Sequence, residues 1–376
     1  MSIDNKWQRF GLLSIVVGWI TTRPPMTSLF TRHAMLLQTT FSELKRQASE
    51  QAFVLVGTPG SVGVRQVKGR GFYYRQFYDA AGRKSAQYIG PVRSPEAEAR
   101  AEAIRSQIAL ATALAKEARG LAERGYVRAD ARTGAIVASF ANHGLFRAGA
   151  TLIGSHAYGA LLNELGVRAA AFMTEDIDLA RGARLALGER GEQKVAFADV
   201  LEASTVPLVP VPALSPKIPS TSYKGRERLR VDLLVPSGGA EVGIKAVPEL
   251  GAHATALPHL RALLEEPIES VLLTREGATA IRVPRPEAFV WHKMQLPSLR
   301  GASDKKRKDV LQASVLFAVL AEDAPGALAE SLAALSAPAR RRLVDGATQA
   351  LRLIEATPHE RALELLVDLV PALRRR

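Results

Sequence analysis

The stretch TLIGSHAYGALLNELGVRAAAFMTEDIDLA, residues 151–180, combines a Gly-Ser pair with two aspartates separated by a single isoleucine. The apolar TEDIDLA segment is typical of a strand, and LLNELGV is typical of a helix that ends at Gly166. Side chains two residues apart in a strand share one face, so Asp176 and Asp178 point the same way. Two like charges this close repel each other. The pattern therefore requires either a positive ion between them or open water around both.

A third aspartate occupies a similar position in a second predicted strand. In RLRVDLLVP, residues 228–236, Leu229, Val231, Leu233 and Val235 alternate toward the core, which places Asp232 on the opposite face. If the two strands are neighbours, three carboxylates converge. Such a cluster suits divalent cations bound through oxygen, Mg²⁺ among them. Two ions about 3.5–4 Å apart can stabilise both the attacking and the leaving oxygen of a phosphoryl transfer.

The Gly-Ser pair, Gly154 and Ser155, is predicted to follow the end of a strand and to begin a helix. The free backbone N–H groups of a helix N-terminus bind phosphate, the glycine permits close approach, and the serine adds a hydroxyl. Each of these features alone is commonplace: a Gly-Ser pair is usually a cap, and a lone DxD is usually a solvated strand end. It is their occurrence together, in this order, that is specific.

These motifs resemble the DNA-polymerase-β-like nucleotidyltransferase superfamily. The segments GLFRAGATLIGSHAYGALLNELGV, TEDIDLA, RVDLLVP, VPRPEAFVWHKM and KKRKDVLQASVL resemble more closely an uncharacterised bacterial nucleotidyltransferase-fold family, related to abortive-infection and toxin–antitoxin nucleotidyltransferases. The resemblance covers about residues 60–325. It implies that Asp176, Asp178 and Asp232 hold metal, and that Gly154 and Ser155 contact the triphosphate.

Further site residues are implied by the same resemblance. Lys293 in VWHKM and the pair Lys308-Asp309 in KKRKDV fall where related toxin branches complete the site on later helices. The lysines would also bind the nucleotide. His156, after the serine, can either face phosphate or be an exposed residue of the first helical turn.

The activity implied is Mg²⁺-dependent transfer of a nucleoside monophosphate from an NTP such as ATP to an acceptor, with two metal ions and release of pyrophosphate. RNA is slightly favoured as acceptor. The alternatives are a toxin-type enzyme that nucleotidylates a protein and a nucleotide- or nucleic-acid-binding module without catalysis. The acceptor, the preferred base and the oligomeric state stay open.

The fold class implied is α+β, with three regions. Residues 1–145 form an N-terminal helix–hairpin–helix region for which acceptor binding is a possible role, residues 146–285 the nucleotidyltransferase core, and residues 286–376 a C-terminal helical domain. Periodicity predicts helices over 27–53 and from Ser94 to about Gly125. It also predicts hairpins over 72–90 and 270–284, and a short helix in KVAFADVLEAS. No strand is predicted between residues 54 and 71.

The composition favours an anionic partner. The chain of 376 residues has a formal net charge of +13. The alternative explanation is an arginine-rich proteome, because arginine is abundant throughout the chain. Residues 64–93 hold seven Lys or Arg against one acid, and also four of the seven tyrosines. In this run Arg70, Arg75, Arg83 and Lys84, with Tyr73 and Tyr78, are candidates for contact with RNA.

Location is constrained only weakly. The chain has no cysteine, which removes disulfides and thiolate metal sites and fits a reducing cytoplasm. The longest apolar run, residues 11–20, is half the length that a membrane-spanning helix needs, so no membrane association is predicted. The same run makes a poor signal peptide. Whether residues 1–25 belong to the folded unit stays open.

Overall fold

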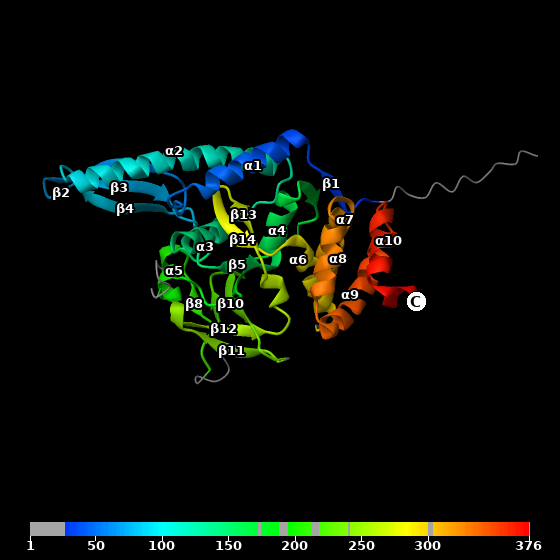
Figure 1. Ribbon diagram of the computed structural model, residues 1–376. Helices are drawn as coiled ribbons and strands as arrows, with labels where there is room; N and C mark the ends of the chain where they lie inside the picture. Colours follow the sequence, from blue (N-terminus) through cyan, green and yellow to red (C-terminus); the bar gives the residue numbers. More distant parts are fainter. Residues whose placement is uncertain are drawn as a thin grey trace, which may run out of the picture.

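The two strands that carry the aspartates, β7 (Asp176–Arg181) and β10 (Arg230–Pro236), lie side by side within the largest sheet. Figure 1 shows the computed structural model, in which a long arm extends from one side of this sheet and a group of helices lies on the other. The structure describes residues 27–171, 174–187, 195–212, 218–239, 241–299 and 304–375. The question about residues 1–25 therefore lies outside the described residues.

The central sheet is mixed. Its strands run in the order β11 (Gly243–Val247), β12 (Ala252–Leu257), β10, β7 and β5 (Ala150–Ile153), with β9 (Ser222–Lys224) paired to β10 and β8 (Val209–Pro210) paired to β9. β10 is parallel to both β7 and β12, whereas β5 is antiparallel to β7. The helices of this region are α3 (Ala131–Asn142), α4 (Gly154–Glu164) and α5 (Phe197–Ala203). The predicted strands, the helix after Gly154 and the short helix α5 are confirmed.

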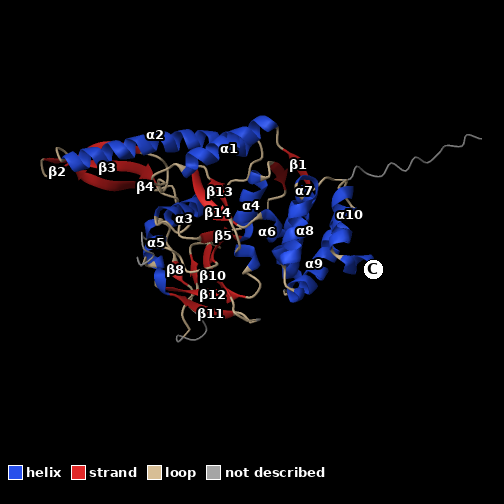
Figure 2. Cartoon of the chain, in the orientation of Figure 1, coloured by secondary structure: helices blue, strands red, loops and turns tan. Residues whose placement is uncertain are grey.

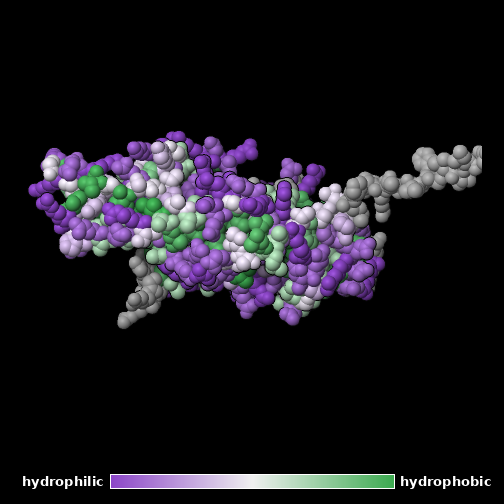
Figure 3. Space-filling view, turned by 90° about the horizontal axis from the view of Figure 1, so that it is seen from above, coloured by the Kyte–Doolittle hydropathy of each residue, from purple (hydrophilic) through white to green (hydrophobic). Residues whose placement is uncertain are grey.

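The arm consists of two helices and a small sheet (Figures 1 and 2). Its elements are α1 (Met35–Ser49), β2 (Ser61–Val67), β3 (Arg70–Tyr78), β4 (Lys84–Pro91) and α2 (Pro95–Glu123). α2 begins as predicted, because Ser94 Oγ accepts a hydrogen bond from the Ala97 backbone N–H at 3.3 Å and Pro95 occupies the first turn. Seen from above, hydrophilic side chains cover most of the surface, with smaller hydrophobic patches along the arm (Figure 3).

Two predictions for the arm need correction. The predicted hairpin is confirmed as β3–β4, but β2 adds a third antiparallel strand, in which Gly63 pairs with Tyr74. No strand was predicted between residues 54 and 71, yet β2 lies there, and Gly57 and Gly60 precede it with positive φ angles. The predicted helix over 27–53 begins only at Met35, because Phe30 lies in β1 (Phe30–Arg32), which pairs with β6 (Val167–Ala169).

The C-terminal region is helical, as predicted (Figure 2). Its main helices are α6 (Pro286–Gln295), α7 (Asp304–Asp323), α8 (Pro325–Ala334), α9 (Ala337–Glu355) and α10 (Glu360–Leu369). The predicted hairpin over 270–284 is confirmed as β13 (Ile268–Leu273) and β14 (Ala278–Val283). None of the helices in the described part of the chain is long and apolar enough to cross a membrane.

One hydrophobic core joins the central sheet to the C-terminal helices. It contains Leu152 and Ile177 from the sheet together with Trp291 and Phe317 from the helices, all four with no exposed surface. Burying each such side chain contributes about 1.5–3 kcal/mol. A smaller core, which includes Phe41, joins α1 and α2 to the β13–β14 hairpin. The chain is thus α+β, as predicted. The boundaries at residues 145 and 285 remain predictions, since shared cores cross both.

Candidate active site

The pairing of β7 with β10 brings together carboxylates that are far apart in the sequence. In this parallel pair Asp178 lies opposite Asp232, and Asp176 lies opposite Arg230. Alternation along each strand directs Ile177 and its apolar neighbours into the core and leaves the aspartates on the other face. The structure therefore groups the three predicted aspartates at one place on the sheet.

Electrostatics at Asp178 reflects this grouping. Burial, together with the like charges of Asp232 and Asp176, raises the pKa of the Asp178 carboxyl to about 6, against the opposing charges of Lys293 and Lys308. The cause is that a buried carboxylate loses hydration and faces like charges, so ionisation is disfavoured. A cation placed here would relieve that cost.

The turn between β5 and α4 lies directly against Asp178. Gly154 has φ +70°, and a Cβ added to it would collide with Asp178 Oδ2. Only glycine allows this approach without strain. The next residue, Ser155, is buried, and its hydroxyl accepts a hydrogen bond from Lys308 Nζ at 2.9 Å. The predicted phosphate loop thus contacts the predicted metal ligands.

The C-terminal helices supply the predicted cations. Lys293 on α6 donates to Asp309 Oδ1 on α7 at 2.6 Å, and both side chains are buried. Burial and the charge of Lys293 lower the pKa of Lys308, while Asp309, Asp176 and Asp178 act in the opposite direction. Lys308 therefore lies within electrostatic reach of the strand carboxylates. All six predicted charged residues and the Gly-Ser pair belong to one neighbourhood.

Two residues that the sequence reasoning missed hold Asp232. Its Oδ1 accepts hydrogen bonds from the Ser222 hydroxyl and, at 2.8 Å, from Arg230 Nε. Arg230 Nη2 also donates to Ser222 Oγ at 2.8 Å. Arg230 was detectable, since it precedes Asp232 by two residues and so shares its face. Ser222 follows a proline-rich loop and pairs only through β9. Within the described ranges no three His, Asp or Glu side chains form a ready metal-binding group.

His156 is buried, so the interpretation as an exposed first-turn residue is wrong. Among the described residues neither ring nitrogen has a well-formed hydrogen bond, although the Thr174 backbone lies near enough to favour the charged ring slightly. Burial lowers the pKa of His156 to about 4, opposed by the nearby Asp130. This histidine thus packs as a buried, neutral ring in the first turn of α4.

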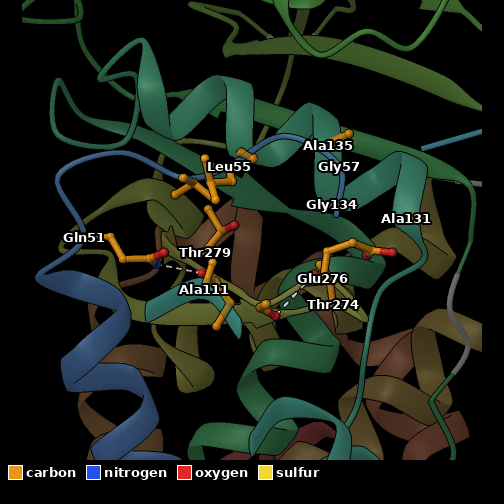
Figure 4. A pocket seen from close by; sticks show the side chains of 14 residues that line it. Gln51, Leu55, Gly57, Ala111, Ala131, Gly134, Ala135, Thr274, Glu276 and Thr279 are labelled. Atoms are coloured by element: carbon orange, nitrogen blue, oxygen red, sulfur yellow. Dashed lines mark hydrogen bonds between the residues drawn. The ribbon is translucent and has the colours of Figure 1, made fainter. Parts of the chain in front are cut away.

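A small pocket of about 20 Å³ lies where the arm meets the core, away from these residues (Figure 4). Gln51, Leu55 and Ala111 contribute from the arm side, and Gly134 and Thr279 from the core. Gln51 Nε2 donates to the Ala278 carbonyl at 2.8 Å across the junction. None of the predicted site residues lines this pocket, so it belongs to the packing of the arm.

Strand carboxylates beside a glycine turn at a helix N-terminus, with two lysines close by, form an arrangement that can bind phosphate groups. A family model described as nucleotidyltransferase matches residues 131–336, more than half of the chain. The chain therefore belongs to this nucleotidyltransferase family and is an enzyme of that type. The match begins at the first residue of α3, so the arm lies outside it. No curated protein and no solved structure matches the chain.

Proposed function

We propose that the protein transfers a nucleoside monophosphate from an NTP to an acceptor in a Mg²⁺-dependent reaction that releases pyrophosphate, with RNA as the acceptor. The observation that carries the proposal is the contact among three motifs: Asp178 lies opposite Asp232, and Gly154 lies against Asp178. Family membership supports nucleotidyl transfer in general.

The residues fit a divalent cation bound through oxygen. Asp176, Asp178 and Asp232 offer carboxylates on one face, and the missing Cβ of Gly154 lets the start of α4 approach Asp178 Oδ2 closely. Arg230 and Ser222 orient the Asp232 carboxylate. When bound, Mg²⁺ would supply charge neutralisation of the phosphates and activation of the attacking hydroxyl.

The other residues position the nucleotide. The backbone N–H groups at the start of α4 and the Ser155 hydroxyl would bind the triphosphate, with Lys308 next to that hydroxyl. Asp309 holds Lys293 in place by a buried ion pair, and Lys293 adds positive charge to the site. Asp232 would accept the proton of the acceptor hydroxyl. Catalysis of this kind depends mainly on positioning and electrostatics.

RNA is proposed as acceptor because the chain carries a net charge of +13 and its arm is rich in basic and aromatic residues. The test is incubation with each labelled NTP and Mg²⁺, together with total RNA or with a lysate depleted of RNA. Label in RNA supports the proposal, and label in protein replaces RNA by a protein acceptor. Absence of label from every acceptor, with the NTP intact, contradicts the transfer activity.

A further inference from the structure

The sheet of the arm has two different faces. α2 covers one: Arg105 of α2 stacks over the Tyr73 ring at 5.8 Å, and a Cβ on Gly90 would meet Ala97 of α2. Arg75 also lies on this side and is buried, with its guanidinium donating to the carbonyl oxygens of Val56, Thr58 and Pro59. Burial lowers the pKa of Arg75 to about 10. Tyr73 and Arg75 are therefore structural, and their prediction as RNA contacts is wrong.

The opposite face presents a row of aromatic rings. Alternation along β3 places Phe72 and Tyr74 away from α2, and the register places Tyr88 of β4 directly opposite Tyr74. The rings of Tyr74 and Tyr88 meet edge to face at 5.5 Å, and those of Phe72 and Tyr88 are tilted at 5.9 Å. Tyr88 keeps 55% of its surface exposed. Phe72 and Tyr74 are partly exposed as well, so the face offers flat rings on which bases can stack.

Exposed cations surround these rings. Arg65 of β2 lies 5.2 Å over the Tyr74 ring, and Arg70 and Lys84 are exposed on the same face by strand register. Residues 61–91 contain one acid, Asp79, which is paired with Arg83 in the β3–β4 turn. The face therefore combines positive charge and flat rings without a carboxylate of its own.

The arm also leads toward the active site. The β3–β4 turn, with Ala81 and Arg83, lines a pocket of about 320 Å³ together with Arg132, Arg226 and Leu229. Leu229 directly precedes β10, the strand of Asp232. A chain lying on the open face of the sheet could thus continue past this turn to the carboxylates.

We infer that this open face, defined by Arg65, Arg70, Phe72, Tyr74, Lys84 and Tyr88, binds a single-stranded nucleic acid by base stacking and phosphate contacts. Stacking tolerates any base, and the cations follow the backbone. A protein partner is disfavoured, because aromatic side chains surrounded by positive charges complement an anionic chain with exposed bases. This inference deepens the proposed function. The role of the bound strand as the acceptor rests on the proposed transfer activity.

The test measures binding of fluorescent 16-nucleotide single strands of RNA and of DNA, and of the duplex RNA, in EDTA without NTP and over a salt series. One variant replaces Arg65, Arg70 and Lys84 by Gln. A matched control replaces Arg100 and Lys116 of α2 and its C-cap residue Arg124, all three exposed cations, by Gln. Tyr74→Leu and Tyr88→Leu probe stacking, and circular dichroism checks that each variant is folded.

We expect the open-face variant to lower the slope of log affinity against log salt by about 2, at about 0.7 for each phosphate that is no longer neutralised, and the control to leave it unchanged. Each tyrosine variant should weaken binding about 5- to 150-fold. Tighter binding of RNA than of DNA identifies RNA as the ligand, and the reverse identifies DNA. Equal slopes in variant and control, or tighter binding of the duplex, overturn the inference.

Failure of this inference can be told apart from failure of the proposed function. Binding is measured without NTP or metal, so it does not depend on transfer. If wild-type protein labels RNA but the open-face variants bind normally, the acceptor binds elsewhere. If the open face binds RNA but no acceptor is ever labelled, the transfer proposal fails and the binding face stands.

Discussion

The carboxylate site and the open face of the arm use lysine and arginine in opposite ways. At the site each cation has a polar or acidic neighbour: Lys293 pairs with Asp309, Lys308 with Ser155, and Arg230 with Asp232. On the open face Arg65 lies over a tyrosine ring, and Arg70 and Lys84 are exposed to solvent. A compact, highly charged ligand needs the first arrangement, whereas a long chain of single charges is held by the second.

Removing a carboxylate from the site should have the largest effect, because it should abolish most of the transfer and leave RNA binding by the arm unchanged. Asp178→Asn keeps the shape of the side chain but removes a proposed metal ligand, so transfer should fall at least about 100-fold, as expected for a loss of several kcal/mol. Metal-free stability should stay equal or rise, because a buried charge among like charges is removed.

The matched control is Glu241→Gln, an exposed carboxylate outside the site. Transfer is measured with labelled NTP, and RNA binding in EDTA should equal that of wild type for both variants. Near-normal transfer by Asp178→Asn would show that the metal-site assignment is wrong.

Replacing either site lysine should weaken NTP binding, but the two replacements should lower the unfolding free energy of the protein by different amounts. Lys293→Met breaks the buried ion pair between Lys293 and Asp309, so the unfolding free energy should fall by about 3–5 kcal/mol. Lys308→Met removes a partly buried cation and its hydrogen bond to Ser155 but breaks no buried ion pair, so the unfolding free energy should fall less, by about 1 kcal/mol.

Denaturant melts give the stabilities, and NTP titrations give the affinities. Both variants should bind NTP more weakly than the control Lys305→Met, which replaces an exposed lysine on α7, the helix of Lys308. Normal NTP affinity in Lys308→Met would remove that residue from the nucleotide site.

The glycine turn tests the contact that joins the motifs. Gly154→Ala places a methyl group in collision with Asp178 Oδ2 and strains a backbone with φ +70°. Gly251→Ala is a matched control, because Gly251 has φ +53° and no atom within 4 Å of an added Cβ. Strain alone costs about 1–2 kcal/mol in both, and the clash adds about 1–3 kcal/mol in Gly154→Ala.

Thermal or denaturant unfolding measures that difference. Transfer should also drop in Gly154→Ala and stay normal in Gly251→Ala. Equal stability losses in the two variants would mean that Asp178 moves aside freely, and the contact would then carry no functional weight.

Local patterns predicted most of the site, because alternation in TEDIDLA and RVDLLVP fixes which side chains share a face. That the two strands are neighbours was only a condition of the prediction, and their parallel pairing was not predicted, since a contact between residues more than fifty positions apart has no local signal. Ser222 was missed because it lies in the short strand β9 after a proline-rich loop, where the local pattern does not indicate a strand. On the arm, Arg75 and Tyr73 were assigned to the wrong face because the third strand and the side covered by α2 could not be deduced from periodicity.

His156 offers a smaller effect, a dependence of stability on pH. Its pKa is lowered by burial to about 4 in the folded chain, against an ordinary value of 6.5, so the unfolded chain binds the proton more readily. The folded state therefore keeps its full stability above pH 6.5 and loses part of it as the pH falls toward 4. By pH 5 the loss should reach about 2 kcal/mol. This contribution should be absent in His156→Gln, whose stability should fall less between pH 7.5 and pH 5.

The measurement is the difference in unfolding free energy between these two pH values, for wild type, His156→Gln and the control His253→Gln on β12. Because the difference is taken within each variant, a uniform loss of packing in His156→Gln cancels. Wild type and the control should lose about 2 kcal/mol more than His156→Gln. If all three proteins lose the same amount, His156 is not held neutral in the first turn of α4. The ring would then be free to meet phosphate as a cation, and the site would hold one more positive group than its lysines supply.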